Sequence, residues 1–542
     1  MASRKMLALS LMLSLAAAWE FPFRVSFPSA NTSGQKVLDV GESGRKPLRI
    51  AIIGAGAGGS SAAFWISKAR ERHGVNVHID VYEKENYIGG RSTTVYPYQN
   101  ASLPPAELGA SIFVDANRNM ARAVKEFNLS LVDFGNDDGD LGIWDGTQFV
   151  LSTSGGGWFG WLDSLKVMWR YGYTSCTRAP KLVAKMIDEF IGIYTPNISH
   201  WSTIEEIGIK LGFDNLTSQT GESFMLSQGI SELYIHELVE AVTRVNYGQN
   251  SDELHALMGL AAMAAEGAHS VAGGNFQVFE HFLSASGASV HLNTTVAGLR
   301  KTTSSSTTQW FVSTSPPPEG NPIPPYDHIV LATPFQSSLI TLLGSPATFD
   351  PPVEYIHLHV TLVATKAARP NPAYFGLKAG STLPSMILTT YDGVRGDPAA
   401  PEPEFNSLSY HGLIRPKDHP DGPEWVVKIF SKDVVKDDWL EKVFGNGNVG
   451  WVYRKEWDSY PKGVPTTAFP PISPDTGLWY VNSFEPFIST METETVSARN
   501  IINSLFEAQY GAGLCGPNKE VESDEGGWGG VGADGKIWGW EC

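Results

Sequence analysis

A glycine-rich turn between a buried strand and a helix constrains the fold of this chain more than any other feature. The apolar run at 48–53 predicts the strand, and a helix-forming stretch at 60–72 follows the turn. In the G-x-G-x-x-G spacing, Gly54 makes the tight turn, Gly56 lets the backbone approach a pyrophosphate, and Gly59 lets helix and strand pack closely. The helix start offers backbone N–H groups to phosphate oxygens. We therefore predict a Rossmann-type dinucleotide-binding domain.

An acidic residue stands at the end of the next predicted strand. Residues 77–82 complete a strand–turn–helix–strand unit, and Glu83 follows them directly. A carboxylate at this place accepts hydrogen bonds from ribose hydroxyls and disfavours a 2′-phosphate. The pattern therefore predicts binding of a dinucleotide other than NADP.

The composition favours a globular chain with more than one domain. The 542 residues exceed the size at which one core stops growing, and 42% of them are hydrophobic. Because the formal net charge is −17, nucleic acid and anionic membrane surfaces are unsuitable partners for the chain as a whole. The cysteines, Cys176, Cys515 and Cys542, are too few for a disulfide scaffold and lack metal-ligand spacing. We therefore predict neither a nucleic-acid partner nor a metal site.

The first residues have the order of a secretory signal peptide. A basic start at 3–5 precedes an apolar run at 6–15 and three small residues at 16–18. The alternative is a membrane anchor, but this run is too short for a hydrocarbon core of about 30 Å, and no later stretch is long enough. We predict a signal peptide at 1–18 and a place in the secretory pathway, in the lysosome or vacuole or outside the cell. Six predicted glycosylation sites agree with this route: Asn31, Asn100, Asn128, Asn197, Asn215 and Asn293.

Helical and strand-like stretches alternate after the leader. Residues 155–270 carry apolar side chains at helical spacing, whereas strand-like runs and turns alternate from about 350 to 470. The Gly- and Trp-rich chain after 511 is expected to be peripheral, although Cys515 and Cys542 could pair and staple it. We predict this division: dinucleotide-binding domain at 46–150, 246–345 and 471–510; helical substrate-lobe insertion at 151–245; strand-rich substrate lobe at 346–470; tail at 511–542.

A second glycine pair resembles that of the amine oxidase and phytoene desaturase class of flavoproteins. Gly89, Gly90 and Arg91 follow the second strand, and a loop ending at Ser111 comes later. In that class the Gly-Gly backbone and the Arg lie along the FAD pyrophosphate and ribityl chain, and the later loop passes near the flavin ring. The resemblance implies an α/β fold with a Rossmann-type FAD-binding domain and an α+β substrate lobe. The alternative is an ordinary turn with a solvated Arg. The same resemblance implies three further FAD-binding positions: Val296, Met491 and Glu492.

Longer stretches resemble the prenylcysteine oxidases, secretory flavoenzymes that clear prenylated cysteine. The most specific is Arg-Val-Asn-Tyr-Gly-Gln at 244–249, which ordinary amine oxidases lack. The resemblance implies hydride transfer to FAD from the carbon next to sulfur in an S-prenyl-cysteine. Water and O2 then complete the release of cysteine, a prenyl aldehyde and H2O2. The tail and the stretch at 370–420 depart from the family pattern. Further matches lie at 51–56, 169–172, 273–275 and 332–334.

Four residues are candidates for catalytic roles. Arg244 could receive the substrate carboxylate as a planar fork, or form a structural ion pair at a helix end. Asn246 and Tyr247 could orient water or the amino group, or cap that helix. His359 falls roughly where related amine oxidases place a lysine near the flavin, although a lone His on a strand is usually structural.

Two other functions stay open on these residues. One is a flavin oxidase of the same fold that acts on an amine or polyamine. The other is a non-enzymatic prenyl-binding escort protein, against which Glu83, the 89–91 segment and the secretory leader speak, because those carriers are cytosolic. The partners we expect are prenylated cysteine and O2. We expect no transmembrane segment and allow for peripheral membrane contact.

Overall fold

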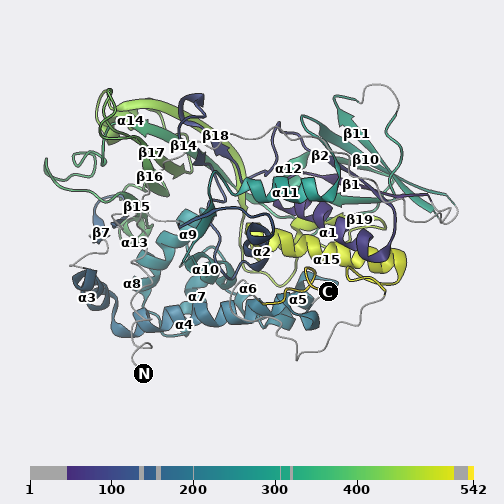
Figure 1. The fold of residues 1–542 in the computed structure, drawn as a ribbon. Helices are drawn as coiled ribbons and strands as arrows, with labels where there is room; N and C mark the ends of the chain where they lie inside the picture. Colours follow the sequence, from purple (N-terminus) through teal and green to yellow (C-terminus); the bar gives the residue numbers. More distant parts are fainter. Residues whose placement is uncertain are drawn as a thin grey trace.

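The computed structural model describes residues 46–133, 140–153, 160–198, 200–265, 267–304, 307–317, 322–517 and 535–542. The predicted signal peptide and Asn31 lie outside these residues. The described chain is a mixed α/β fold with two large sheets at opposite ends and helices beneath and between them (Figure 1).

The glycine-rich turn leaves the central strand of a five-stranded parallel sheet. The residues of this strand alternate between two cores, as the strand period requires. Ile50 and Ile52 pack against helices, whereas Ala51 and Ile53 pack against a three-stranded sheet on the other face. In spatial order the strands are β19 (Leu478–Tyr480), β12 (His328–Leu331), β1 (Leu48–Ile53), β2 (Val77–Tyr82) and β9 (Ser289–His291).

Helices cover one face of this sheet, and the three-stranded sheet covers the other (Figure 1). The Nε1 of Trp65 donates to the carbonyl oxygen of Thr495 at 3.1 Å and joins two of these helices. The helices are α1 (Ala57–His73), α2 (Arg118–Glu126), α11 (Phe276–Ser286) and α15 (Met491–Tyr510), and the strands are β11 (Thr307–Ser315), β10 (Thr295–Ser304) and β13 (Thr341–Leu343).

A seven-stranded sheet forms the other end of the molecule. The strands at residues 355–365, 424–431 and 449–461 are long and antiparallel, and α14 (Asp437–Phe444) packs on one face of the sheet. The prediction assigned residues up to 150 to the dinucleotide-binding domain, but β6 pairs with β15, so this stretch belongs to the substrate-lobe sheet. The order is β18 (Val449–Pro461), β14 (Tyr355–Thr365), β17 (Glu424–Ser431), β16 (Ser407–Arg415), β15 (Met386–Thr389), β6 (Leu141–Trp144) and β7 (Phe149–Ser152).

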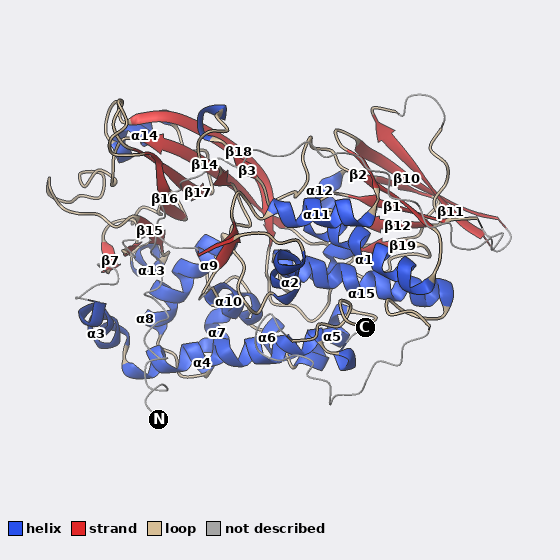
Figure 2. Cartoon of the chain, viewed as in Figure 1, coloured by secondary structure: helices blue, strands red, loops and turns tan. Residues whose placement is uncertain are grey.

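Helices gather beneath the seven-stranded sheet, where the sequence predicts a helical insertion (Figure 2). A π-helical turn at Ile235–Val239 joins α8 (Glu232–Tyr234) to α9 (Glu240–Tyr247), and α9 carries the first four residues of the Arg-Val-Asn-Tyr-Gly-Gln segment. The helical lobe continues past its predicted end at 245, because α10 packs against α7 and α9. No described helix combines the length and apolarity needed to cross a membrane. The helices are α3 (Gly160–Tyr171), α4 (Tyr173–Phe190), α5 (Ile204–Leu211), α7 (Gly221–Ser227), α8 (Glu232–Tyr234), α9 (Glu240–Tyr247) and α10 (Ala256–Met263).

The end of the chain is part of the core, contrary to the expected peripheral tail. The Trp540 ring lies 5.0 Å from that of Phe64 on α1, and its Nε1 donates to Asn119 Oδ1 at 3.0 Å. Cys515 and Cys542 form a disulfide that ties residues 535–542 to the end of α15. Trp538 and Trp540 are therefore core residues of the dinucleotide-binding domain.

Candidate active site

Two of the three predicted glycines are required by the protein's own backbone. Gly54 has a φ of +106°, and a Cβ there would lie 2.5 Å from the carbonyl oxygen of Ala332. A Cβ at Gly59 would lie 1.9 Å from the carbonyl oxygen of Gly54. At Gly56, in contrast, the nearest atom to an added Cβ is the Cα of Gly90 at 3.7 Å, an ordinary contact. Gly56 is therefore required only if a ligand approaches this backbone, which fits a dinucleotide pyrophosphate.

Glu83 closes the same turn from the end of β2. Its Oε2 accepts a hydrogen bond from the N–H of Ala55 at 2.8 Å, and its Oε1 accepts one from Glu85 at 2.9 Å. Burial raises the pKa of Glu83, and these two donors oppose the rise. The N–H of Thr294, two residues before Val296, donates to the carbonyl oxygen of Glu83 at 2.8 Å. Val296 packs in the same apolar cluster as Ile53 and Tyr82, the last residues of the two strands that lead to Gly54 and Glu83.

Gly89 and Gly90 lie against the first glycine segment. The N–H of Gly89 donates to the carbonyl oxygen of Ala55 at 2.9 Å. Gly89 and Gly90 have φ values of +117° and +59°, and a Cβ at Gly90 would lie 3.2 Å from the Cα of Gly56. The two predicted glycine segments therefore meet backbone to backbone, so a diphosphate on one would lie along the other.

Arg91 is held by a carboxylate that the sequence analysis missed. Its guanidinium pairs with buried Glu485, and its Nη1 donates to the carbonyl oxygen of Ser459 at 2.7 Å. Burial opposes the charge of Arg91, but Glu485 outweighs this and raises the pKa of the guanidinium. Glu485 also accepts from the hydroxyl of Tyr355. An acidic residue inside the apolar stretch 481–488 was the available signal.

A second missed carboxyl, Glu494, lies in α15 against the first turn of α1. Its Oε2 is 2.8 Å from where a Cβ of Gly58 would stand, and its Oε1 has no hydrogen-bond partner among the described residues. Burial, and then the charge of Glu485, raise the pKa of Glu494 well above its ordinary value, against the opposing charge of Arg91. Glu494 therefore lies beside the helix start that would face a diphosphate, with one carboxyl oxygen not bonded to the described chain.

Ser111 contacts the third missed residue, Lys428. The Nζ of Lys428 donates to the Ser111 Oγ at 2.7 Å, and the neighbouring Ala110 has a φ of +46°, which is strained for a non-glycine residue. Burial lowers the pKa of Lys428 and raises that of Glu107, while the two opposite charges oppose both shifts. A lysine within the apolar strand 424–431 was the sequence signal for this group.

At the start of α15, the two predicted FAD-binding residues, Met491 and Glu492, differ in what their side chains contact. Thr490 caps the helix by accepting from the N–H of Thr493 at 3.0 Å, and Met491 follows as a buried residue. The Glu492 carboxylate accepts from the N–H groups of Asn119 and Met120 at 2.9 Å each. Its side chain thus stabilises the N-terminus of α2, and only its backbone amide is available for the predicted FAD contact.

Arg244 is buried without an ion-pair partner among the described residues. Its guanidinium donates to Thr389 Oγ1 at 3.0 Å, Asn250 Oδ1 at 2.8 Å and Asn406 Oδ1 at 3.4 Å, all neutral groups. Burial lowers its pKa, and three surrounding carboxylates oppose this from a distance. The alternative of a structural ion pair is therefore not what the structure has.

Tyr247 links the end of α9 to the Arg91 region, whereas Asn246 points to a neighbouring helix. The Tyr247 ring lies 5.7 Å from that of Tyr460. Tyr460 follows Ser459, whose carbonyl binds Arg91. The Nδ2 of Asn246 donates to the carbonyl oxygen of Ala262 at 3.0 Å, a contact within the helical lobe.

His359 lies on the face of β14 opposite to that of Lys428. Lys428 pairs with Leu362, and alternation along β14 places residues 358, 360 and 362 on one face and His359 on the other. The ring of His359 faces Glu456 on β18, with Nδ1 at 3.8 Å from Oε2. The structure therefore does not bring His359 to the Ser111 loop; Lys428 is the basic residue there.

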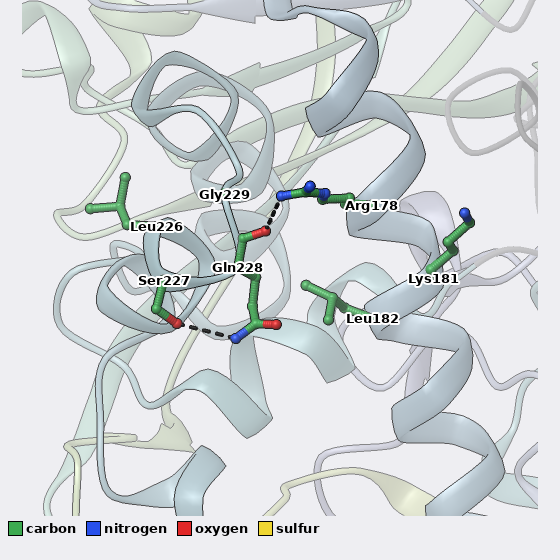
Figure 3. Close-up of a pocket in the computed structure, with 7 residues that line it drawn as sticks. All are labelled: Arg178, Lys181, Leu182, Leu226, Ser227, Gln228 and Gly229. Carbon is green, nitrogen blue, oxygen red and sulfur yellow. Dashed lines mark hydrogen bonds between the residues drawn. The ribbon is translucent and has the colours of Figure 1, made fainter.

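A surface pocket of about 450 Å³ lies between α4 and the end of α7 (Figure 3). The Nη1 of Arg178 donates to the carbonyl oxygen of Gln228 at 2.9 Å across it. None of the predicted site residues lines this pocket. It is separate from the candidate active site.

Comparisons with known proteins agree with this geometry. A family model described as NAD(P)-binding Rossmann-like domain matches residues 52–127. The fold is shared with cyclohexylamine oxidase from Brevibacterium oxydans (15% identity, TM-score 0.53, covering 86% of this chain and 100% of that one). It is also shared with a fatty acid isomerase from P. acnes (14% identity, TM-score 0.55, covering 85% and 99%).

Two curated relatives are more similar in sequence. Farnesylcysteine lyase of Arabidopsis thaliana is 30% identical over 471 residues, covering 84% of this chain and 87% of the relative. Prenylcysteine oxidase 1 of Rattus norvegicus is 30% identical over 488 residues, covering 84% and 88%. The family model described as prenylcysteine lyase matches residues 157–511. With its glycine segments, Arg91 and the Arg-Val-Asn-Tyr-Gly-Gln segment in place, this chain belongs to the prenylcysteine lyase family.

Proposed function

We propose that this protein is an FAD-dependent prenylcysteine oxidase. It would convert a farnesyl- or geranylgeranyl-cysteine, O2 and water into free cysteine, a prenyl aldehyde and H2O2. The main support for a substrate with a carboxylate comes from Arg244. Its guanidinium is buried and has only neutral hydrogen-bond partners in the described chain. A buried charge whose hydrogen-bond partners are all neutral is unfavourable, so a ligand carboxylate would be bound there strongly. Names of curated relatives, farnesylcysteine lyase and prenylcysteine oxidase 1, support the same class.

Bound FAD would supply the acceptor for the hydride that leaves the carbon next to sulfur. Gly54, Gly56, Gly89 and Gly90 would hold its diphosphate, and Glu83 its ribose. The chain itself would hold the substrate carboxylate at Arg244. Tyr247 packs on Tyr460 and would fix the end of α9 relative to the cofactor, so that the reacting carbon keeps one position.

Lys428 would act as a hydrogen-bond donor next to the flavin loop. Its Nζ is directed by the Ser111 hydroxyl, and burial lowers its pKa, so it can exchange a proton more readily than an exposed lysine. We assign it to holding the water that adds to the oxidised carbon. This replaces His359, which faces the other side of the sheet.

Anaerobic and aerobic assays with farnesylcysteine test the proposal. With O2, the purified yellow protein should yield cysteine, farnesal and H2O2 in equal amounts; without O2, the substrate should bleach the flavin. Arg244→Met should raise KM more than it lowers kcat, and Arg244→Lys should restore part of the loss. Ammonia with an intact thioether would instead identify an amine oxidase. Binding without bleaching would identify an escort protein, and unchanged farnesylcysteine would contradict the proposal.

FAD would be held without a covalent bond. Acid precipitation should release the flavin into the supernatant, and a yellow pellet would contradict this. Glu83→Gln should weaken FAD retention by about 1–3 kcal/mol, since it removes a charged hydrogen-bond acceptor. Glu85→Gln is the matched control, because the Glu85 carboxylate faces the Nζ of Lys455 at 3.9 Å, whereas Glu83 accepts the hydrogen bond from the Ala55 N–H in the turn.

We also propose that the protein enters the secretory pathway and is glycosylated. Five predicted acceptors, Asn100, Asn128, Asn197, Asn215 and Asn293, are exposed, which glycosylation requires. Expression in eukaryotic cells should give a chain that starts after about residue 18 and loses mass on deglycosylation. A cytosolic, unmodified chain would contradict this assignment. Fractionation of the cells and the medium then distinguishes a lysosomal or vacuolar protein from a secreted one.

Peripheral membrane contact would use the junction of α3 and α4. Trp169 and Tyr173 have exposed fractions of 91% and 69%. The exposed cations Lys166 and Arg178 stand three residues before Trp169 and five residues after Tyr173. Exposed aromatic and basic side chains together suit an anionic lipid surface. Cosedimentation with anionic vesicles, lost in Trp169→Ser and absent with neutral vesicles, is the expected result.

A further inference from the structure

Two histidines and two carboxylates face each other on neighbouring strands of the substrate-lobe sheet. In the antiparallel pairing of β14 with the edge strand β18, His357 lies opposite Asp458 and His359 lies opposite Glu456. All four side chains stand on the same face, because successive residues of a strand alternate. Leu358 between the histidines points to the apolar core on the other side.

Three side-chain atoms of this group that could bind a metal ion lie close together. The His357 Nε2 and the His359 Nδ1 each lie 3.8 Å from the same oxygen, Oε2 of Glu456. These ligand atoms all lie within 4.8 Å of one another. Ligands at about 2.0–2.1 Å from a tetrahedral zinc ion lie roughly 3.3 Å apart. Small side-chain rotations would therefore place all three on one ion.

The remaining carboxylate has the geometry of an outer-shell group. The Oδ1 of Asp458 lies 3.2 Å from Nδ1 of His357, the ring nitrogen that does not face Glu456. Histidines that bind metals usually donate their other N–H to a carboxylate, which fixes the tautomer and orients the ring. Asp458 is held in turn by the hydroxyl of Ser337, which donates to its Oδ2 at 2.7 Å.

We propose that His357, His359 and Glu456 form a binding site for a divalent cation of the zinc type. Two imidazoles and one carboxylate suit zinc, whereas magnesium and calcium favour oxygen-only sets. Three protein ligands leave one position for water. Sequence reasoning missed the site because it considered only cysteine spacing, while His-x-His and Glu-x-Asp lie about one hundred residues apart and meet only through strand pairing.

The site lies where the substrate-lobe sheet meets the dinucleotide-binding domain, so a bound ion would affect how the two are connected. Ser337 belongs to α12 (Phe335–Ser338), which follows β12 of the dinucleotide-binding sheet. The bonded series His357, Asp458 and Ser337 therefore joins the substrate-lobe sheet to the dinucleotide-binding domain. A bound cation would strengthen this connection, and this holds whichever reaction the enzyme catalyses.

Zinc titration of the tag-free, flavin-loaded, chelator-treated protein tests the site. Calorimetry should detect one tight equivalent of Zn²⁺, and zinc should raise the melting temperature. His359→Ala and Glu456→Gln should weaken zinc binding at least about 100-fold, and Asp458→Asn should weaken it about 10- to 100-fold. His419→Ala, a surface histidine beside Asp421, is the matched control and should bind zinc as the parent does.

X-ray absorption at the zinc edge provides the second readout. It should give two imidazole nitrogen ligands in the parent and one in His359→Ala. Each variant must melt like the parent without zinc, so that loss of binding is separated from misfolding. Absence of a tight equivalent in the parent, or binding unchanged by His357→Ala and His359→Ala together, would overturn the proposal.

Discussion

The Nζ of Lys428 on β17 donates a 2.7 Å hydrogen bond to Oγ of Ser111, which lies 317 residues earlier in the chain. This contact joins the substrate-lobe sheet to the loop after β4 (Ala106–Glu107). Lys428 is only 7% exposed, so its charge is matched from within the protein. Glu107 provides the opposite charge, and it is fixed by the N–H of Asn275, which donates to its Oε1 at 2.8 Å.

The first prediction concerns this pair of opposite charges. Lys428→Met should destabilise the fold by about 1.5–3 kcal/mol, because it removes a charged hydrogen bond and leaves Glu107 buried alone. Adding Glu107→Gln should recover part of this loss, with a coupling of about 0.5–3 kcal/mol. Urea unfolding of the parent, the two single variants and the double variant measures the cycle. Strictly additive losses would contradict an interaction between the two charges.

The second prediction separates two glycines of the same turn. Gly59→Ala should lower the free energy of unfolding by more than about 3 kcal/mol, because its Cβ would lie 1.9 Å from the Gly54 carbonyl oxygen. Gly56→Ala should change stability by less than about 1 kcal/mol but raise the Kd for FAD at least about tenfold. Denaturant unfolding without FAD and fluorescence titration with FAD measure the two effects. Normal FAD affinity in Gly56→Ala would argue against a pyrophosphate at this backbone.

The third prediction is an acid sensitivity that originates in His255. This buried ring caps α10 by accepting from the N–H of Met258, and its Nε2 lies 3.0 Å from the carbonyl oxygen of Pro486. Burial lowers its pKa from 6.5 to about 4. Between these values the unfolded chain binds more protons, so the free energy of unfolding falls as the pH falls, by up to about 3 kcal/mol.

Replacing His255 should remove this contribution. His255→Asn keeps a capping side chain without a titrating ring, so its stability should depend less on pH across the same window. Urea unfolding at about pH 7 and about pH 5 compares parent and variant. An equal loss of stability in both would place the acid sensitivity elsewhere.

The fourth prediction concerns the C-terminal segment. Trp540→Ala should lower the free energy of unfolding by about 3–5 kcal/mol, because the ring packs on Phe64 and Trp65. The control Trp169→Ala removes a 91% exposed ring and should stay within about 0.5 kcal/mol of the parent. Reduction of Cys515–Cys542 should cost about 3–4 kcal/mol on the chain-entropy model. Thermal and denaturant unfolding, with and without reductant, measure all three, and equal effects of the two tryptophan substitutions would contradict a core role.

Sequence patterns assigned local geometry well and side-chain partners less well. The prediction placed Glu492 at the helix start that faces the cofactor, and the helix does start there, but its carboxylate binds the N-terminus of α2. It named His359 as a candidate near the flavin, whereas the register puts that side chain on the face opposite to Lys428 and the Ser111 loop. A shift of one residue reverses the face of every side chain in a strand, so register cannot be read from composition alone.

The dinucleotide-binding turn, the class of fold and the family could all be predicted from the residues alone. Gly54, Gly56 and Gly59 act through the conformation of a few adjacent residues, and adjacency is what a sequence displays. The partners of the buried charges, in contrast, became visible in the folded chain. Arg91 meets Glu485 across 394 positions, and Lys428 meets Ser111 across 317. Such pairs depend on how sheets and helices pack, because burial makes a charge require whichever opposite group the packed chain brings within reach.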